Sequence, residues 1–223
     1  MLAIVLAAFF AGSPTSPLEL ARDRQDRASL EKLAADAGAA AAKAPGDAEA
    51  QYHAALAYSY LTEVAMETGD RKTRRQFAEQ GIKPAEKAVS MKPENAEYHR
   101  VLGTLYGLAV TDLMSGLSYG PKAKDAINKA VEKAPKASMM YVARGVGNYY
   151  LPAQLGGGSK AAIPDFQKAI ELDPKNAEAY LWLGLGLRKE NRDAEARQAF
   201  TKALELNPNR AWAKQQLDKT PTK

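Results

Sequence analysis

The residues that could do chemistry are few and far apart along this chain. It has two histidines, His53 and His99, and no cysteine, which excludes thiol nucleophiles, thiolate metal sites and disulfides together. A metal site shared by the two histidines would need a third ligand at a matching helical offset, and we find no such partner. The acidic residues are dispersed rather than paired. We therefore predict that the protein is not an enzyme and has no catalytic residue, metal or cofactor.

Two short motifs resemble anion-binding sequences. Gly156-Gly-Gly-Ser-Lys160 superficially resembles a phosphate loop, but it follows an expected helix and lacks the spacing of that motif, so we interpret it as a flexible connector. Arg71-Lys-Thr-Arg-Arg75 is the densest basic run and lies near an expected helix start, where the helix dipole also favours anions. An anion site there is one interpretation, and a solvated helix face is the one we prefer. We expect no nucleic-acid partner.

Prolines mark the ends of the elements that must position these side chains. Four segments of similar sequence end at Pro93, Pro135, Pro174 and Pro208, and a degenerate copy ends at Pro45. Each proline forces its predecessor out of the helical region and lacks the amide that a helix uses. The successive spacings are 48, 42, 39 and 34 residues. This pattern predicts a series of helical units, each closed by a proline.

The expected helix starts agree with these ends. Asp47, Asn95 and Asn176 each follow one of the prolines and precede an Ala-Glu pair. An Asp or Asn side chain caps the free amides of the first helical turn, and the Glu behind it complements the positive end of the helix dipole. These three positions are therefore predicted helix caps.

Small residues recur where paired helices are expected to cross. Gly184, Ala196 and Ala203 take these positions in the last copy, and Gly103 and Gly145 match Gly184 in two earlier copies. Two antiparallel helices approach closely only if small side chains lie at the crossing and large ones fill the space beside it. The pattern thus predicts closely packed helix pairs.

The last copy resembles the tetratricopeptide repeat family, whose period is 34 residues. Its bulky and small residues stand where the family places such types: Tyr180, Leu183, Gly184, Leu187, Ala196, Phe200, Ala203 and Pro208. The resemblance implies an all-α, right-handed α-solenoid of antiparallel helix pairs. It divides the chain into an N-terminal capping helix at 17–47, repeats at 48–95, 96–137, 138–176 and 177–210, and a C-terminal capping helix and tail at 211–223.

Residues in excess of the 34-residue period are expected between the two helices of each earlier repeat. In the first repeat they should lengthen both helices, which break at Gly69-Asp70 and are disturbed near Gly81 and Pro84. In the second they should extend the first helix through Leu113 towards Gly116. In the third, a loop should follow Pro152, with Ser159 as the next helix cap. The capping helix is expected as one long helix over Leu18 to Ala44.

The inner face of such a solenoid is lined by the first helix of each repeat. One inward-facing stripe predicts the binding residues Tyr52, Leu56, Arg100, Thr104, Met139, Val142, Val146, Tyr149, Leu181, Leu185 and Arg188. This register gives an apolar centre with arginines on either side. It suits an apolar peptide, an amphipathic helix or an acyl chain with an acidic end. Alternatively, the extra-long helices curl over and bury this stripe as core.

The resemblance implies a non-enzymatic scaffold that binds a protein or peptide partner. Family members that bind acidic chaperone tails use a Lys, Asn and Arg clamp on this same stripe, and this chain lacks it: those places hold Tyr52, Leu56, Thr104, Met139 and Ala143. The alternative function is that of a small-molecule or lipid carrier with an apolar ligand. It follows from Tyr149 to Gly158 and Ala162 to Ala169, which are similar to periplasmic partner subunits of tripartite (TRAP) transporters.

The first residues suggest where the protein works. Leu2 to Gly12 is an unbroken run of apolar and small residues, and as a helix it would reach only about 16 Å, well short of the ~30 Å hydrocarbon core. Its length suits the core of a secretory signal, although no Lys or Arg precedes it. We predict a signal peptide or N-terminal apolar segment at 1–16 and an exported, periplasmic or secreted protein. Membrane contact would occur only through this segment if uncleaved. The alternative is a cytoplasmic adaptor.

Overall fold

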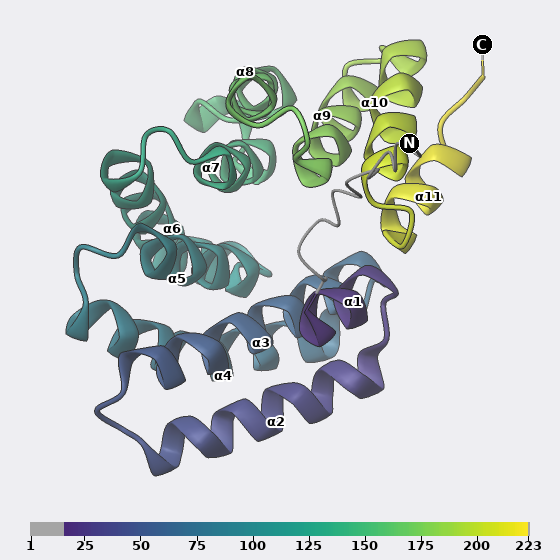
Figure 1. Cartoon of the computed structure of the whole chain (residues 1–223). Coiled ribbons are helices and arrows are strands. Elements are labelled where there is room, and N and C mark those ends of the chain that lie inside the picture. Colours follow the sequence, from purple (N-terminus) through teal and green to yellow (C-terminus); the bar gives the residue numbers. More distant parts are fainter. Residues whose placement is uncertain (1–15, 223) are drawn as a thin grey trace, which may run out of the picture.

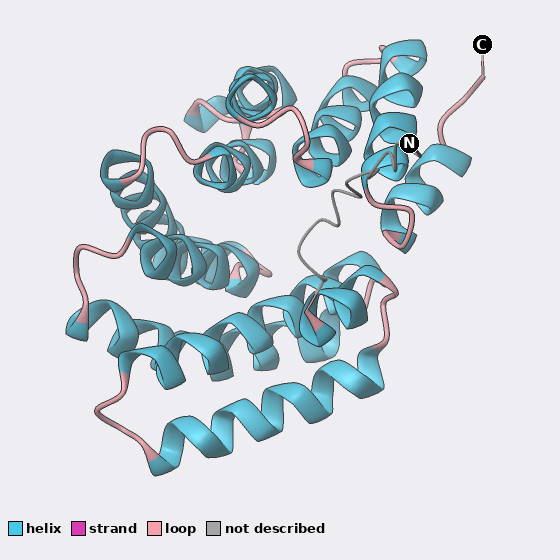
Figure 2. Ribbon diagram, in the orientation of Figure 1, coloured by secondary structure: helices cyan, strands magenta, loops and turns pink. Residues whose placement is uncertain are grey.

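The protein is built from helices alone in the part that the structure describes. The computed structural model describes residues 16–222, which form eleven α-helices, one short 3-10 helix and no strand. Short loops join the helices throughout (Figure 2). The predicted all-α solenoid of antiparallel helix pairs is confirmed. Apart from Ser16, the signal peptide or apolar segment predicted at 1–16 lies outside the described residues.

Helix pairs follow one another along a curved path (Figure 1). The chain starts with α1 (Pro17–Asp23) and α2 (Arg27–Lys43). The pairs that follow are α3 (Ala48–Glu67) with α4 (Arg71–Met91), α5 (Ala96–Ala109) with α6 (Leu113–Lys133), α7 (Ser138–Tyr150) with α8 (Ser159–Leu172), and α9 (Ala177–Lys189) with α10 (Asp193–Leu206). The short 3-10 helix η1 (Ala153–Leu155) lies between α7 and α8, and α11 (Ala211–Asp218) follows the last pair.

The single long N-terminal helix expected over Leu18 to Ala44 is instead two helices. α1 begins with a capping box, in which the Ser16 hydroxyl accepts from the Glu19 amide and the Glu19 carboxylate accepts from the Ser16 amide. Gln25 has a φ of 54°, a left-handed conformation that ends a helix. The side chain of Asp26 then caps α2. The break therefore comes from local backbone geometry that apolar periodicity does not reveal.

The three predicted caps are confirmed. The Asp47 carboxylate accepts from the amide of Glu49 at 2.9 Å, and the Asn95 side chain accepts from the amide of Glu97 at 3.0 Å. The Asn176 side chain accepts from the amide of Ala179 at 3.1 Å. Each cap satisfies an amide that has no partner within its own helix. The starts of α3, α5 and α9 are thus fixed by single side chains.

The glycines at the helix crossings are also confirmed as close contacts. A Cβ added at Gly184 would lie 2.6 Å from the ring of Phe200, and one at Gly103 would lie 2.7 Å from Ile127. A Cβ at Gly145 would collide with the ring of Phe166. Each glycine therefore lets the second helix of its pair place a large side chain directly on the backbone of the first.

The second repeat differs from the prediction, because its extra residues lengthen the second helix. α5 ends at Ala109 instead of running towards Gly116, and α6 starts at Leu113. Asp112 and Ser115 form a capping box that begins α6. In addition, Arg74 of α4 donates to the carbonyls of Leu108 and Val110, which satisfies acceptors left open at the end of α5.

The third repeat has the expected loop but not the expected cap. Ser159 is the first helical residue of α8, preceded by Gly158, and its hydroxyl donates to the carboxylate of Glu190. Gly156 and Gly158 have φ values of 85° and 94°, which glycine adopts without strain. The amide of Gly158 donates to the carbonyl of Asn148 at 2.8 Å. The predicted flexible connector is therefore a hydrogen-bonded turn.

The two ends of the described chain meet. Asn207, at the end of α10, donates to the carboxylate of Asp23 in α1 at 2.7 Å, and Gln215 of α11 donates to Gln25 at 2.9 Å. Side chains from the end of α10 and from α11 thus reach the end of α1 and the turn that follows it. Among residues 16–222, no helix is both long and apolar enough to cross a membrane.

Candidate functional site

The predicted inner stripe divides into a half-buried part and a core part. In the half-buried part are Tyr52, Leu56, Thr104, Met139, Val146 and Tyr149. Val142, Leu181 and Leu185 are 4%, 0% and 5% exposed and belong to the main apolar core. The prediction that these three line a binding groove is therefore corrected, because they are covered.

The long helix α3 contributes to the burial of these three residues. Its residue Met66 packs against the same apolar cluster as the third and fourth repeats. The hydroxyl of Tyr150, at the end of α7, lies 3.5 Å from the sulfur of Met66. Thus the C-terminal end of α3 reaches across the curve of the solenoid. The alternative, in which the stripe is buried as core, applies to Val142 in the third repeat and to Leu181 and Leu185 in the fourth.

The two predicted arginines of the stripe are both engaged within the protein. Arg100 donates from Nε and Nη2 to the carboxylate of Glu97 at 2.6 and 2.5 Å, and Tyr52 donates to the same carboxylate at 3.2 Å. Arg188 donates to the backbone and side-chain oxygens of Gln216 at 3.2 and 2.6 Å. Arg188 therefore attaches α9 to α11, whereas Arg100 stays beside the half-buried part of the stripe.

A tyrosine cluster surrounds Arg100 on the first two repeats. The ring of Tyr52 stacks on that of Tyr98 with centroids 4.9 Å apart, and Tyr98 donates to Glu49 at 2.6 Å. Burial and the neighbouring Glu97 carboxylate raise the pKa of Tyr52, and burial raises that of Tyr60. Both phenols stay protonated at neutral pH. They offer hydroxyl groups beside an otherwise apolar surface.

An aromatic cluster centred on Trp182 was missed by the stripe prediction. Trp182 contacts the rings of Tyr149, Tyr150 and Trp212 with centroids 5.8, 6.0 and 5.3 Å apart. It is 5% exposed, whereas Tyr150 is 55% exposed. Trp182 lies next to Leu181 in sequence, so the chosen stripe passed beside it. The adjacent aromatic pair Tyr149 and Tyr150 was the available signal.

A buried ionic cluster, here called the Arg210 cluster, closes the solenoid. It consists of Arg22, Asp23, Glu63, Glu67, Glu178 and Arg210. Arg210 is 1% exposed. Its guanidinium donates to Glu63 at 2.7 Å, to Glu178 at 2.7 Å and to both carboxylate oxygens of Glu67. The carboxylates come from α1, α3 and α9, so one side chain joins the first repeat to the last.

The Arg210 cluster holds two guanidinium groups and four carboxylates. Burial raises the pKa of Glu63 to about 7, although Arg22 and Arg210 oppose the shift. Burial also acts against ionisation of Glu178, but the guanidinium groups of Arg210 and Arg22 outweigh it and lower the pKa of that carboxyl. Glu63 therefore takes up a proton near neutral pH.

The remaining candidates from the sequence are placed as follows. His53 is exposed on α3, 3.4 Å from Glu49, whereas His99 is buried with Nε2 2.8 Å from the carbonyl oxygen of Pro93. Among residues 16–222, His, Cys, Asp and Glu side chains form no group that could hold a metal ion. In the basic run 71–75, Arg74 binds backbone carbonyls and Arg75 pairs with Glu79 at 2.9 Å.

These features define the class of protein. Antiparallel helix pairs that cross closely at glycines form a tetratricopeptide-type solenoid. Residues 156–211 match the family model described as tetratricopeptide repeat. Proteins of this class are interaction scaffolds that bind protein or peptide partners. Residues 7–152 match the model described as regulator of microtubule dynamics protein 1-3. The chain belongs to this family.

Individual relatives share parts of the sequence or the fold. Small glutamine-rich tetratricopeptide repeat-containing protein 2 of Mycosarcoma maydis is 32% identical over 104 residues, 47% of this chain and 28% of that protein. Cytochrome c-type biogenesis protein CycH of Rhizobium meliloti (strain 1021) is 35% identical over 69 residues, 26% of this chain and 18% of that protein. The chain thus covers less than a third of the length of either relative.

Two solved structures share the fold at low sequence identity. A thermophilic tetratricopeptide repeat protein of Thermus thermophilus has a TM-score of 0.62 and 21% identity, covering 90% of this chain and 97% of that one. The HusA haemophore from Porphyromonas gingivalis has a TM-score of 0.54 and 20% identity, covering 88% and 96%. At these identities the likeness shows the fold alone.

Proposed function

We propose that the protein is a non-enzymatic scaffold that holds an apolar segment of another protein against the inner face of its first three repeats. The observation that carries the proposal is the division of the predicted stripe. Leu181 and Leu185 are core residues, whereas Tyr52, Leu56 and Thr104 are only half-buried. The free part of the stripe therefore lies on α3, α5 and α7, where Met139, Val146 and Tyr149 are also half-buried.

The chemistry of this part suits a segment with apolar side chains and a few hydrogen-bonding groups. Leu56 and Met139 supply apolar surface, and the phenols of Tyr52 and Tyr60 supply hydroxyl groups. The guanidinium of Arg100 is neutralised by Glu97, so it offers little net charge to a partner. Recognition would rest on burial of apolar area, with hydroxyl groups setting the orientation.

Site-specific photo-cross-linking tests this function. A photoreactive phenylalanine is introduced at Leu56 or Met139 on the inner face, and at exposed Gln167 of α8 as the control. The same partner should cross-link from both inner positions in cells and not from the control, as identified by mass spectrometry. Because the family model is named for regulators of microtubule dynamics, purified tubulin is one partner to assay directly. Cross-links confined to position 167 would contradict the proposal.

We also propose that the scaffold works in the cell envelope after export. The support is the apolar run Leu2 to Gly12, whose length suits the core of a secretory signal. Fractionation of cells combined with N-terminal sequencing of the mature protein tests this location. Export predicts an envelope fraction and a new N-terminus close to residue 16. An intact N-terminus in the cytoplasmic fraction would support the adaptor alternative instead.

A second candidate function is transport of an apolar small molecule or lipid. The aromatic cluster around Trp182 favours it, because aromatic side chains commonly line sites for apolar ligands. Native mass spectrometry of protein purified without detergent, followed by organic extraction, would detect a co-purified ligand. Replacement of Tyr150 by Ala should reduce that ligand, while the cross-links at Leu56 should remain. A mass equal to that of the chain alone would count against this function.

A further inference from the structure

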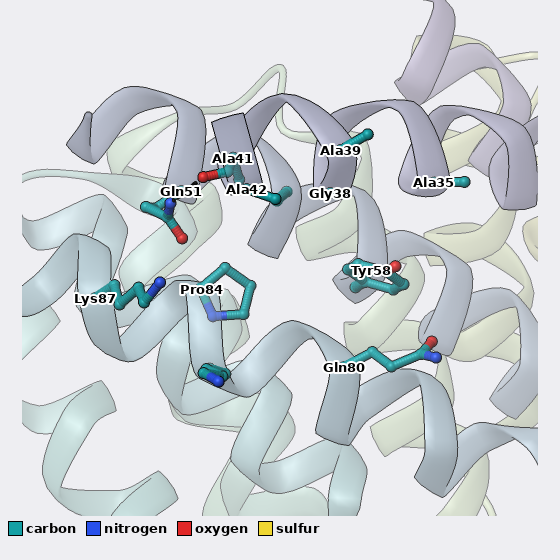
Figure 3. Close-up of a pocket in the computed structure, with 12 residues that line it drawn as sticks. Ala35, Gly38, Ala39, Ala41, Ala42, Gln51, Tyr58, Gln80, Pro84 and Lys87 are labelled. Carbon is teal, nitrogen blue, oxygen red and sulfur yellow. Dashed lines mark hydrogen bonds between the residues drawn. The ribbon is translucent and has the colours of Figure 1, made fainter. Parts of the chain in front are cut away.

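A second surface with the features of a binding site lies between α2 and α4. There a groove of about 470 Å³ runs over α3 (Figure 3). It is separate from the inner stripe, since its lining contains none of the predicted stripe residues. The first helix pair therefore carries a groove that the proposed function does not use.

The α2 wall of the groove carries no side chain longer than a methyl group. It consists of alanines and Gly38, and a Cβ added at Gly38 would lie 3.4 Å from the hydroxyl of Tyr58. The stretch from Ala35 to Ala42 is about 10 Å long, or two helical turns. A small-residue wall of this length allows the backbone of another helix to approach closely.

The α4 wall supplies positive charge. Lys83 and Lys87 lie one helical turn apart and both line the groove. Neither forms an ion pair with any residue in the range 16–222, and the groove lining contains no acidic residue. A ligand bound between these walls would therefore gain from negative charge on the side that faces α4.

Two hydrogen-bond acceptors near the groove remain available, although no side-chain nitrogen or oxygen that is itself buried lacks a partner in the described part of the chain. Gln51 is 2% exposed, and its Nε2 donates to the carbonyl of Ala41 at 2.8 Å. Its Oε1 accepts no hydrogen bond from the described part of the chain and points into the groove (Figure 3). Pro84 has no amide, so the carbonyl of Gln80 lacks its usual helical donor. Both acceptors would be satisfied by a ligand that brings hydrogen-bond donors.

We propose that this groove binds an acidic amphipathic helix of a partner protein. Its small apolar residues would pack on the alanine wall of α2, and its carboxylates would face Lys83 and Lys87. Because the backbone amides of a helix are already bonded, the donor to Gln51 would be a side chain such as that of Ser or Thr. This mode is the docking of a helix into a groove, with charge setting its direction.

Fluorescence anisotropy with a defined probe tests the site on the full chain. The probe is a labelled helical peptide of about four turns with an alanine face, glutamates on one flank and one serine. A second peptide has lysine in place of each glutamate. The acidic peptide should bind, and the lysine peptide should bind at least about tenfold more weakly, because like charges would then face each other. Equal binding of the two peptides would overturn the proposal.

Paired variants locate the binding. Lys83→Gln with Lys87→Gln should weaken binding roughly fivefold, the size expected for two exposed ion pairs. Ala39→Gln with Ala42→Gln should abolish binding because it fills the groove at two exposed positions. The matched control is Lys124→Gln with Lys136→Gln, an equal change of charge at exposed lysines. Circular dichroism melts verify that each variant is folded. Unchanged affinity of both groove variants would contradict the site.

An experiment with lipid vesicles distinguishes binding of an acidic helix from binding of an anionic lipid surface. Vesicles of phosphatidylcholine with phosphatidylserine are sedimented with the same variants. Sedimentation that depends on Lys83 and Lys87, without binding of the acidic peptide, would replace the helix proposal by a lipid one. Neither result bears on cross-links from Leu56 and Met139, because those positions do not line the groove.

Discussion

At the scale of single residues, Arg210 has the most consequential environment in the chain. It lies just before α11, yet its guanidinium binds carboxylates from α3 and α9 that are up to 147 positions away. A buried guanidinium is expensive to desolvate and is tolerated only when its hydrogen bonds are satisfied by acceptors such as these. The sequence places it after Pro208 among other polar residues, and nothing there distinguishes it from a surface arginine.

Replacement of Arg210 by Met should be strongly destabilising. The change removes the hydrogen-bond donor of Glu63 and Glu67 and leaves Arg22 as the only guanidinium of the cluster, and the loss of one partner from such a buried group typically costs about 3–5 kcal/mol. Chemical denaturation followed by circular dichroism measures the free energy of unfolding. As a control, Arg192→Met removes an exposed arginine that pairs with Glu195, and its effect should be far smaller. Similar losses in the two variants would show that burial of Arg210 is not decisive.

The pKa of Glu63 predicts how stability depends on pH. Burial raises it from 4.5 to about 7 in the folded protein. Between these values the folded protein keeps a proton that the unfolded chain releases, so the free energy of unfolding falls as the pH rises from 4.5 to 7. The fall should be on the order of 2 kcal/mol. Denaturation curves across this pH range should show it in the wild type and not in Glu63→Gln. Parallel slopes in both proteins would refute the assignment to Glu63.

At the scale of the elements, glycines allow the helices of a pair to pack closely. A large side chain from the second helix lies directly on the backbone of each glycine in the first. Phe166 of α8 lies on Gly145 of α7, and Phe200 of α10 lies on Gly184 of α9. Both phenylalanines are 0% exposed. The pairing of α7 with α8 and of α9 with α10 therefore depends on two positions where no side chain fits.

Two glycines on the same helix provide a matched test. Gly145→Ala places a Cβ against the ring of Phe166 and should destabilise the protein by about 1–3 kcal/mol through overpacking. Gly147→Ala meets no atom within 4 Å, so it should be neutral or stabilise by up to about 1 kcal/mol through helix propensity. Thermal melts of both variants measure the difference. Equal shifts of the melting temperature would argue against the packing role of Gly145.

The sequence predicted these elements better than it predicted the site, for a physical reason. Caps such as Asn176 and crossings such as Gly184 act on neighbours within one repeat, so local spacing reveals them. The break at Gln25 and the end of α5 depend on a left-handed residue and on Arg74, which approaches from another helix. Burial of Leu181 depends on packing between distant repeats, and periodicity within one helix carries no information about it.

At the scale of the whole molecule, the solenoid is closed by contacts between its two ends. Asp23 of α1 accepts from Asn207, and Arg210 binds Glu63 and Glu67 of α3. These contacts bring the first and last repeats together and leave the half-buried stripe on α3, α5 and α7 as the free part of the inner face. Closure therefore limits which partners can reach that face.

Distance measurements between spin labels would report on closure. The chain has no cysteine, so cysteines introduced at exposed Ala28 and Lys214 would be labelled uniquely. The wild type should give one narrow distance distribution, and Arg210→Met should broaden it because the ends separate. A second pair at Gln167 and Thr201 lies within neighbouring repeats and should keep its distribution. An unaltered distribution for the first pair would mean that other contacts hold the ends together.

The contacts between the α1 end of the chain and the α10–α11 end also alter how the array should lose its structure. In an open repeat array each unit contacts only its neighbours, so the terminal units fray first and independently. Here a terminal helix cannot detach without exposing the buried charges of the opposite end. Fraying is thereby coupled to disruption of both ends at once, and the array should melt as one cooperative ring instead of unzipping repeat by repeat.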